Sequence, residues 1–236
     1  MSLKDEFDLN FIVHNYFPPP KEHFVLNMAS LNDDVYSKSI EHYKRAIDLS
    51  AELGADSYGM HAGFFINITT DQLGKRIRKS ELFDKQEAME RFCEGFSELK
   101  TFSGDLSLYI ENNVFSYDNS QEYSESTPLM MTCYAEYQEL KSMIDFKLLL
   151  DVAHLKVSAH TLGLDFDKEL AEMSKHSDYW HLSDNNQLAD ENRTIGDDLI
   201  IKLKQLPDRP KKATIEVYEE IDIVANNYFA INETLF

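Results

Sequence analysis

The stretch KLLLDVAH, residues 147–154, decides how this sequence is interpreted. Three successive leucines precede Asp151, and His154 follows three positions later. Such an apolar run is expected to form a strand that is covered on both faces, as in a parallel sheet flanked by helices. A carboxylate at the end of this strand is costly to bury unless another group pairs with it. We therefore expect Asp151 to belong to a larger polar site that the fold brings together.

Similar apolar runs recur along the chain and alternate with amphipathic stretches. Short buried strands are predicted at 9–14, 56–61, 106–111, 146–151, 178–183 and 212–218. Helices are predicted between and after them at 37–54, 84–100, 130–144, 164–176, 194–206 and 219–236. Alternation of strand and helix indicates a parallel sheet with crossover helices. No linker rich in Gly, Pro or Ser interrupts the pattern, so residues 1–236 are predicted to form a single domain.

Each predicted strand ends in, or is closely followed by, ionisable residues of the kinds that bind metals. In chain order they are His14, His61, Glu111, Asp151 with His154, His181 with Asp184, and Glu216. In a parallel α/β barrel all strands end on the same face, so these side chains would converge at one mouth. Convergent carboxylates repel one another unless a cation neutralises them, and a divalent metal is the simplest such cation. A single buried histidine is more often a hydrogen-bonded core residue, but the repeated pattern predicts a metal site.

Charge and composition restrict the partners that we expect. The formal net charge of −19 argues against a nucleic-acid partner, because nucleic-acid binding depends on neutralising phosphates. The only dense basic segment, KRIRK at 75–79, is interpreted as a solvated helix face. No apolar run approaches the roughly 20 residues that span a bilayer, and the acidic N-terminus does not have the layout of a secretory signal. Together with two separated cysteines, Cys93 and Cys133, these features predict a cytoplasmic protein without a membrane partner.

Several motifs carry a resemblance to a known family. The segments LYIENN (108–113), LLLDVAH (148–154), WHLSDNNQLADENRTIGDD (180–198) and TIEVY (214–218) resemble, in order and spacing, the xylose-isomerase-like TIM barrels. This superfamily contains sugar isomerases and epimerases and metal-dependent apurinic endonucleases. The segments FIVHNYF (11–17) and LGADSYGMHAGFF (53–65) are similar to two earlier strands of the endonuclease branch. The resemblance implies a TIM-type (β/α) barrel of six to seven clear strands, with the first or eighth strand missing or irregular.

The resemblance also implies a central metal and catalytic roles. Glu111, Asp151, His181 and Glu216 would hold an ion, and this oxygen-rich set suits Mn²⁺, Mg²⁺ or Co²⁺ and also accepts Zn²⁺. In a sugar isomerase or epimerase, Glu111 and Glu216 would exchange a proton on opposite faces of an enediolate. His154 would hydrogen-bond a substrate oxygen. Asp184 is interpreted as a residue that orients a ligand rather than binding metal itself.

Further positions distinguish the branches of the superfamily. His14 and His61, bridged by Glu111, would hold a second metal in endonuclease-like members or contact substrate in sugar-handling ones. A third metal would need His154, Asp190 and one more histidine, and Asn192 stands at that last position. Some ketose epimerases carry an arginine six residues after the ligand histidine, whereas this chain has Gln187 there.

The leading prediction is therefore a divalent-metal-dependent isomerase or epimerase that acts on a small sugar or sugar phosphate. The alternatives are a zinc-dependent phosphodiesterase of the apurinic endonuclease type and a degenerate barrel without catalysis. The missing strands would leave one gap in the barrel, which we expect the N-terminal segment, the C-terminal helix or the partner in a homodimer to cover. The long segment 112–128 is either an active-site lid or a mobile acidic surface loop.

Overall fold

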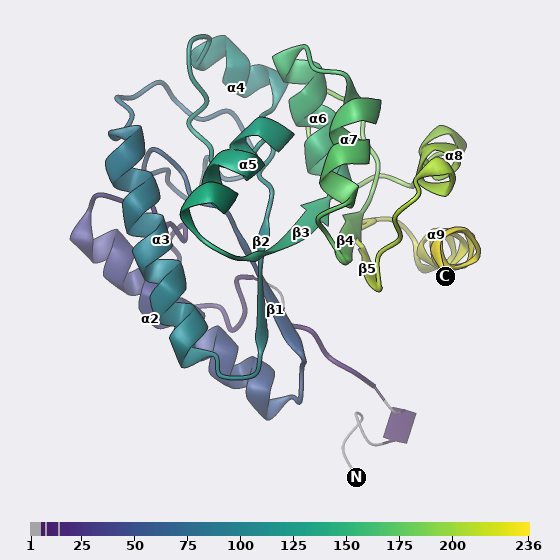
Figure 1. Ribbon diagram of the computed structural model, residues 1–236, viewed down its shortest axis with the longest axis horizontal. Coiled ribbons are helices and arrows are strands. Elements are labelled where there is room, and N and C mark those ends of the chain that lie inside the picture. The colour runs from purple at the N-terminus through teal and green to yellow at the C-terminus, as the bar shows by residue number, and fades with distance from the viewer. Residues whose placement is uncertain (1–5, 8, 14) are drawn as a thin grey trace.

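A sheet of five parallel strands forms the centre of the computed structural model, which describes residues 6–7, 9–13 and 15–236 (Figure 1). The strands are β1 (Ser57–His61), β2 (Ser107–Glu111), β3 (Lys147–Asp151), β4 (Tyr179–Leu182) and β5 (Lys212–Ile215). Strands that follow one another in the chain are also neighbours in the sheet, and all four pairs are parallel. This winding is that of an open part of an α/β barrel.

Helices cover the sheet on its outer side. They are α2 (Asp33–Glu52), α3 (Lys85–Phe102), α5 (Tyr134–Met143), α6 (Val152–Leu162), α7 (Phe166–Ser174), α8 (Asp197–Gln205) and α9 (Ile221–Leu235). The short helix α4 (Tyr117–Glu122) lies instead in the segment that follows β2 and contacts α6. Figure 1 shows α2 and α3 beside β1 and β2, and α8 and α9 at the opposite side next to β5. No helix in the described ranges combines the length and hydropathy needed to cross a membrane.

Strand residues alternate between the helix layer and the barrel interior. The outward side chains, such as Trp180 on β4, join the main hydrophobic core with the helices. The inward side chains of Tyr109, Leu149 and Tyr179 form a small separate cluster. Gly59 on β1 leaves room for this cluster, because a Cβ there would lie 2.6 Å from Cδ1 of Leu149. The interior is therefore filled with side chains below the ends of the strands.

The first predicted strand, 9–14, is wrong over its described part. Residues 9–13 form no strand, and His14 lies outside the described residues. The carbonyl oxygen of Asn15 accepts a hydrogen bond of 2.7 Å from the hydroxyl of Tyr58 on β1. The N-terminal segment therefore contacts β1 through a side chain and not through strand pairing. The described sheet consequently has fewer strands than the six to seven expected, and β1 and β5 are its two edges.

The two edge strands are joined at their N-terminal ends. Nζ of Lys212 on β5 donates a hydrogen bond of 2.8 Å to Oγ of Ser57 on β1 and forms an ion pair with Asp56. At the same edge, α9 packs against β5, as the single C-terminal helix predicted from the sequence. The N-terminal segment and α9 therefore flank the open side of the barrel.

The segments above the sheet also differ from expectation. The basic segment 75–79 is irregular rather than helical, and Arg76 forms an ion pair with Glu122 in the segment 112–128. That segment contains α4, and Oδ1 of Asn119 accepts a hydrogen bond of 2.7 Å from the Ile77 backbone. The two segments therefore pack against each other, and the Arg76 side chain is held by a tertiary contact rather than lying on a helix face.

Candidate functional site

Four predicted ligand residues meet where four neighbouring strands end. Glu111 and Asp151 are the last residues of β2 and β3, His181 lies on β4, and Glu216 directly follows β5. Each offers one ligand atom, and these atoms all lie within 4.8 Å of one another. The Glu111 side chain is 4% exposed and that of Glu216 is 16% exposed. Residues more than 100 positions apart in the sequence thus form one largely buried group, which we call the carboxylate centre.

The chemistry of the carboxylate centre fits a divalent cation. Nδ1 of His181 lies 3.2 Å from Oε1 of Glu111 and 3.1 Å from Oε1 of Glu216. Burial and the nearby carboxylates of Glu111 and Glu216 raise the pKa of Asp151 to about 7, against the opposing effect of His154. Three acids gathered around one imidazole are an oxygen-rich donor set of the kind that Mg²⁺ and Mn²⁺ prefer and Zn²⁺ accepts. An ion would neutralise the charge that these acids concentrate.

Tyr179 orients the imidazole of this centre. Its hydroxyl lies 3.3 Å from Nε2 of His181 and 2.8 Å from Oγ1 of Thr214. With Nε2 facing the tyrosine, Nδ1 of His181 is the nitrogen that points at the carboxylates. Hydrogen-bond partners of this kind fix the ring orientation of metal-binding histidines. This role of Tyr179 is not among those predicted above, although its place two residues before His181 on the inward face of β4 is the signal that identifies it.

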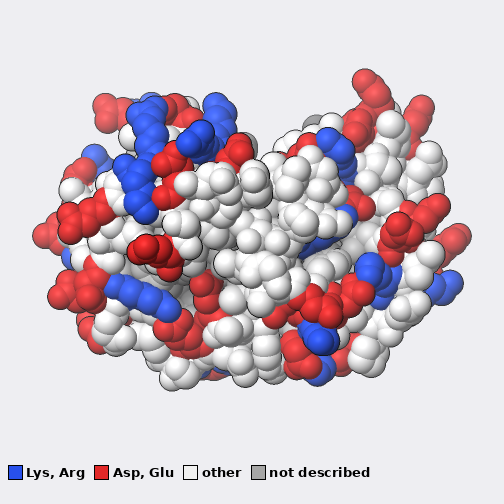
Figure 2. Space-filling view, turned by 90° about the horizontal axis from the view of Figure 1, so that it is seen from above, with Lys and Arg blue, Asp and Glu red and all other residues white. Residues whose placement is uncertain are grey.

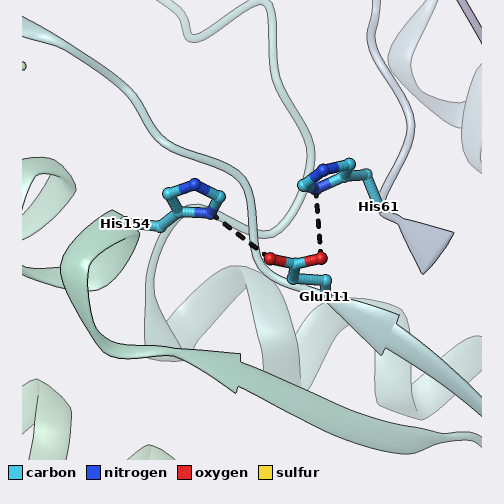
Figure 3. A group of neighbouring side chains, drawn as sticks. All are labelled: His61, Glu111 and His154. Atoms are coloured by element: carbon cyan, nitrogen blue, oxygen red, sulfur yellow. Dashed lines mark ion pairs between the residues drawn. The ribbon is translucent and has the colours of Figure 1, made fainter. Parts of the chain in front are cut away.

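A second group of potential ligands shares Glu111 with the first. Oε2 of Glu111 lies 3.5 Å from Nδ1 of His61, and Oε1 lies 3.9 Å from Nδ1 of His154. Figure 3 shows the carboxylate between the two imidazoles, whose ring centroids are 5.9 Å apart. On its other side, Nε2 of His154 lies 3.4 Å from Oδ2 of Asp190. The structure therefore brings three further predicted residues next to the carboxylate centre, and we call them the histidine group.

Asn112 connects the two groups through the backbone. Its side chain donates a hydrogen bond of 2.9 Å to the Asp151 carbonyl and accepts one of 2.8 Å from the Asp151 amide. Its own carbonyl accepts a hydrogen bond of 2.8 Å from Nδ1 of His154. Because a carbonyl can only accept, Nδ1 carries the proton and Nε2 faces Asp190. This buried asparagine is not among the predicted site residues, and its only signal in the sequence is its place directly after Glu111.

Asp151 has a second role at the start of α6. Its Oδ1 accepts a hydrogen bond of 2.7 Å from the backbone amide of His154, so Asp151 is the N-cap of this helix. An N-cap carboxylate is stabilised by the free amides at the helix end. The tight turn from β3 into α6 consequently fixes Asp151 and His154 relative to each other.

The protonation equilibria of the site follow from its charge pairs. Burial acts to raise the pKa of Glu111, but the charges of His61 and His181 lower it below its usual range. Burial also opposes protonation of His181, yet the charge and hydrogen bond of Glu111 raise its pKa to about 9. The pKa of His154 is raised in the same manner by Asp151 and Asp190, against burial. Metal binding at such a site displaces protons and is therefore dependent on pH.

Other predicted positions lie outside these contacts. The carboxylate of Asp184 forms an ion pair with Lys156 and accepts hydrogen bonds from the backbone amides of Asn185 (2.8 Å) and Gly196 (3.1 Å). These contacts shape the loop that carries Asp190. Asn192 in this loop has a positive φ of 49°, and its carbonyl accepts a hydrogen bond of 2.9 Å from the Tyr218 amide.

A cavity of about 600 Å³ adjoins the histidine group. Its lining includes His61, His154, Asp190 and Asn113, together with apolar residues of three loops. Another cavity, of about 660 Å³, lies at the opposite end of the strands and is lined by charged side chains that include Lys100, Asp145 and Arg209. Only the first of these two cavities reaches the predicted ligands, so we take it as the candidate substrate cavity.

Comparisons with known proteins agree with this architecture. A sequence profile described as the xylose isomerase-like TIM barrel matches residues 2–209. No curated protein matches the sequence significantly.

Solved structures with the same fold include proteins named for different reactions. A D-tagatose 3-epimerase-like protein matches with a TM-score of 0.69 and 19% identity, over 99% of this chain and 79% of that one. The 3-keto-D-glucoside 4-epimerase of E. coli matches with a TM-score of 0.59 and 9% identity, over 90% and 76% of the two chains. Endonuclease IV from Thermus thermophilus matches with a TM-score of 0.58 and 15% identity, over 95% and 75%.

These likenesses at low identity establish the fold and leave the reaction to the chemistry of the site. The profile match covers most of the sequence, and the winding of the five strands agrees with it. The chain therefore belongs to the xylose isomerase-like TIM barrel family.

Proposed function

We propose that this protein is a divalent-metal-dependent isomerase or epimerase that acts on a small sugar, a sugar phosphate or a related hydroxy-ketone. The observation that carries the proposal is the convergence of Glu111, Asp151, His181 and Glu216 within 4.8 Å, next to a cavity large enough for a small molecule. A barrel mouth with this donor set supports chemistry at a carbon next to a carbonyl group.

In this proposal the four residues of the carboxylate centre hold the ion. When bound, it would supply positive charge beside a carbonyl oxygen and thereby favour loss of a proton from the neighbouring carbon. Glu216 is the more exposed of the two glutamates, and we assign it the removal of that proton. In an isomerisation, Glu216 returns the same proton to the adjacent carbon. In an epimerisation, Glu111 on the other side of the centre passes a proton taken up from water to the opposite face, and Glu216 releases the removed proton to water.

His154 and Asp190 position the substrate in the same proposal. The Asn112 carbonyl fixes the proton of His154 on Nδ1, so Nε2 is directed toward Asp190 and the cavity. A protonated Nε2 would donate a hydrogen bond to a substrate oxygen, and Asp190 would accept one from a hydroxyl. His61, on the other side of Glu111, would contact the substrate.

A second candidate function is a zinc-dependent phosphodiesterase. The histidine group supports it, because His61 and His154 flank Glu111 and together could hold a further ion. Asn192 argues against a third ion, since position 192 has an amide where the endonuclease pattern has a histidine ligand. We therefore rank hydrolysis below proton transfer.

The proposal is tested by metal analysis followed by hydrogen exchange. Protein purified without chelators should contain about one divalent ion per chain, whereas a phosphodiesterase of the endonuclease type should contain two or three. In D₂O the metal-loaded protein should incorporate deuterium next to the carbonyl of a ketohexose or ketopentose substrate. Glu216→Gln should abolish this exchange, while Glu219→Gln, a change of the same kind at an exposed neighbouring position, should retain it.

Two outcomes would contradict the proposal. Protein that neither contains nor takes up Mn²⁺ or Zn²⁺ would indicate a degenerate barrel. Incision of a duplex with an abasic site by the purified protein, lost in His61→Gln, would favour the phosphodiesterase.

A further inference from the structure

A second hydrophobic cluster lies apart from the main core, and we call it the loop cluster. It is built from segments that follow β1 and β2, together with the N-terminal segment. Its buried members are Val25, Phe64, Ile66, Ile68, Ile77, Phe115, Tyr123 and Leu129. None of these residues lies in a strand of the sheet. The loop cluster is therefore separate from the packing of helices on the sheet.

The loop cluster lines the candidate substrate cavity. Its members on the cavity wall are Val25, Phe64, Ile68, Ile77 and Leu129. Two more apolar residues, Val114 and Leu73, also line the cavity, and Leu73 is 52% exposed. The histidine group forms part of the same wall. The cavity thus has a polar region beside the predicted ligands and an extended apolar region that no sugar hydroxyl would satisfy.

The cavity is large enough for a ligand that extends beyond the histidine group. Its volume of about 600 Å³ lies within the roughly 300–1,000 Å³ of pockets that enclose drug-sized ligands. A sugar ring that lay in the apolar region, rather than at the histidine group, would bury hydroxyls against apolar side chains, which is unfavourable without hydrogen-bond partners. An apolar group in this region would instead release water from the loop cluster.

The charged residues at the cavity include both signs, so they do not favour a ligand substituent of one charge. Lys75, Arg76 and Asp118 all line it, and Arg76 is paired with Glu122. On the face of the molecule drawn in Figure 2, acidic and basic side chains also occur in mixed groups rather than in a patch of one sign. An uncharged apolar substituent is therefore the group that best matches this region.

We infer that the cavity binds a glycoside-type molecule, in which a polyhydroxylated ring carries an uncharged aromatic or aliphatic substituent. The ring lies at His61, His154 and Asp190, and the substituent lies on the loop cluster. The place of the ring rests on the proposed function, whereas the apolar subsite rests on the cavity itself.

The inference is tested by comparing two ligands that differ only in the substituent. Isothermal titration calorimetry would measure binding of 4-nitrophenyl β-D-glucopyranoside and of methyl β-D-glucopyranoside to the metal-loaded protein. The aryl glycoside should bind at least about tenfold more tightly. Leu73→Ser and Val114→Thr should each weaken the aryl glycoside at least about threefold and leave the methyl glycoside unchanged. Leu164→Ser is the matched control, because Leu164 is 40% exposed and lies outside the cavity lining.

Equal affinities for the two glycosides, or no binding of either, would overturn the inference. An aryl preference that survives both cavity variants would also overturn it, since the substituent would then bind elsewhere. The result is separable from that of the proposed function. Tighter binding of the aryl glycoside that is sensitive to Leu73→Ser supports the apolar subsite even if the protein exchanges no deuterium. Deuterium exchange with a free ketose supports the proposed function even if the aryl group adds no affinity.

Discussion

Nδ1 of His181 on β4 lies 3.2 Å from Oε1 of Glu111 on β2, although β3 separates the two strands in the sheet. The two side chains reach each other over the end of β3, where Asp151 stands. This arrangement places an acid from the central strand between ligands from the strands on both sides. The curvature of the open barrel thus gives Asp151 its place in the carboxylate centre.

Asp151→Asn should weaken metal binding by at least about 100-fold, because it removes a charged ligand, a larger change than loss of an outer partner. Competition with a chromophoric chelator would measure the affinity for Mn²⁺ and Zn²⁺. Asp184→Asn is the matched control and should keep the affinity close to that of the unaltered protein, since Asp184 pairs with Lys156. Similar losses in both variants would show that the metal does not bind at the carboxylate centre.

Asn112→Ala should lower the free energy of unfolding by about 2–4 kcal/mol, because it leaves the buried amide and carbonyl of Asp151 without their partners. Urea unfolding monitored by circular dichroism would measure this change. Metal affinity should fall as well, since the Asp151 backbone loses the side chain that holds it, whereas the backbone carbonyl that binds His154 remains. Asn186→Ala, at an exposed position, is the control. Unchanged stability in Asn112→Ala would contradict the role assigned to this residue.

Gly63→Ala should destabilise the fold by about 1–3 kcal/mol, as is usual for overpacking. A Cβ at this position would lie 2.6 Å from Cβ of Ala29 and 2.8 Å from Sδ of Met130. Gly59→Ala is the comparison, because its Cβ would meet only the end of the Leu149 side chain, which can rotate. Thermal unfolding should therefore show a larger decrease in Tm for Gly63→Ala. The opposite order would mean that the Leu149 cluster is the more rigid of the two sites.

His42 should make the protein less stable in acid. It is fully buried, stacks on Tyr16 at 5.3 Å between ring centroids, and neither of its ring nitrogens has a hydrogen-bond partner in the described structure. Burial, with a smaller effect of the Arg45 charge, lowers the pKa of His42 in the folded protein. The unfolded chain therefore takes up this proton first, below about pH 6.5. The contribution of neutral His42 to the free energy of unfolding is complete above that pH and is lost as the pH falls toward the lowered pKa.

The measurement for His42 is Tm between pH 7.5 and pH 5. His42→Phe should flatten the decrease in Tm on the acid side, because phenylalanine keeps the ring contacts and cannot bind a proton. His160→Gln, on the exposed side of α6, should follow the curve of the unaltered protein. An unchanged acid slope in His42→Phe would assign the loss of stability to other groups.

Much of the sheet could be predicted because its strands are continuous apolar runs. This feature alone identifies KLLLD as a strand, and the same reasoning locates β1, β2 and β4 to within about a residue. It failed at 9–14, where Phe11 and Ile12 are 39% and 40% exposed. An apolar run specifies that a segment is extended or buried, but a strand also needs a partner that supplies hydrogen bonds.

The potential metal ligands of the candidate site could be predicted from the sequence, whereas the residues that hold those ligands in place could not. Ionisable residues at successive strand ends identify Glu111, Asp151 and His181 because parallel strands end on one face. The role of Asn112 depends on its distance from Asp151 on the neighbouring strand, which no local pattern encodes, whereas Tyr179 contacts His181 of its own strand. Helix α6 escaped prediction because most of its residues are apolar or buried, which leaves little contrast between its faces.

The position of Glu111 has a consequence for any titration of this protein with metal. One carboxylate oxygen faces His181 and the other faces His61, so the carboxylate centre and the histidine group share a single charge. An ion bound on one side would change the affinity of the other side for a second ion, and by thermodynamic linkage the change would be equal in both directions. Binding data fitted with identical, independent sites would therefore misstate both constants.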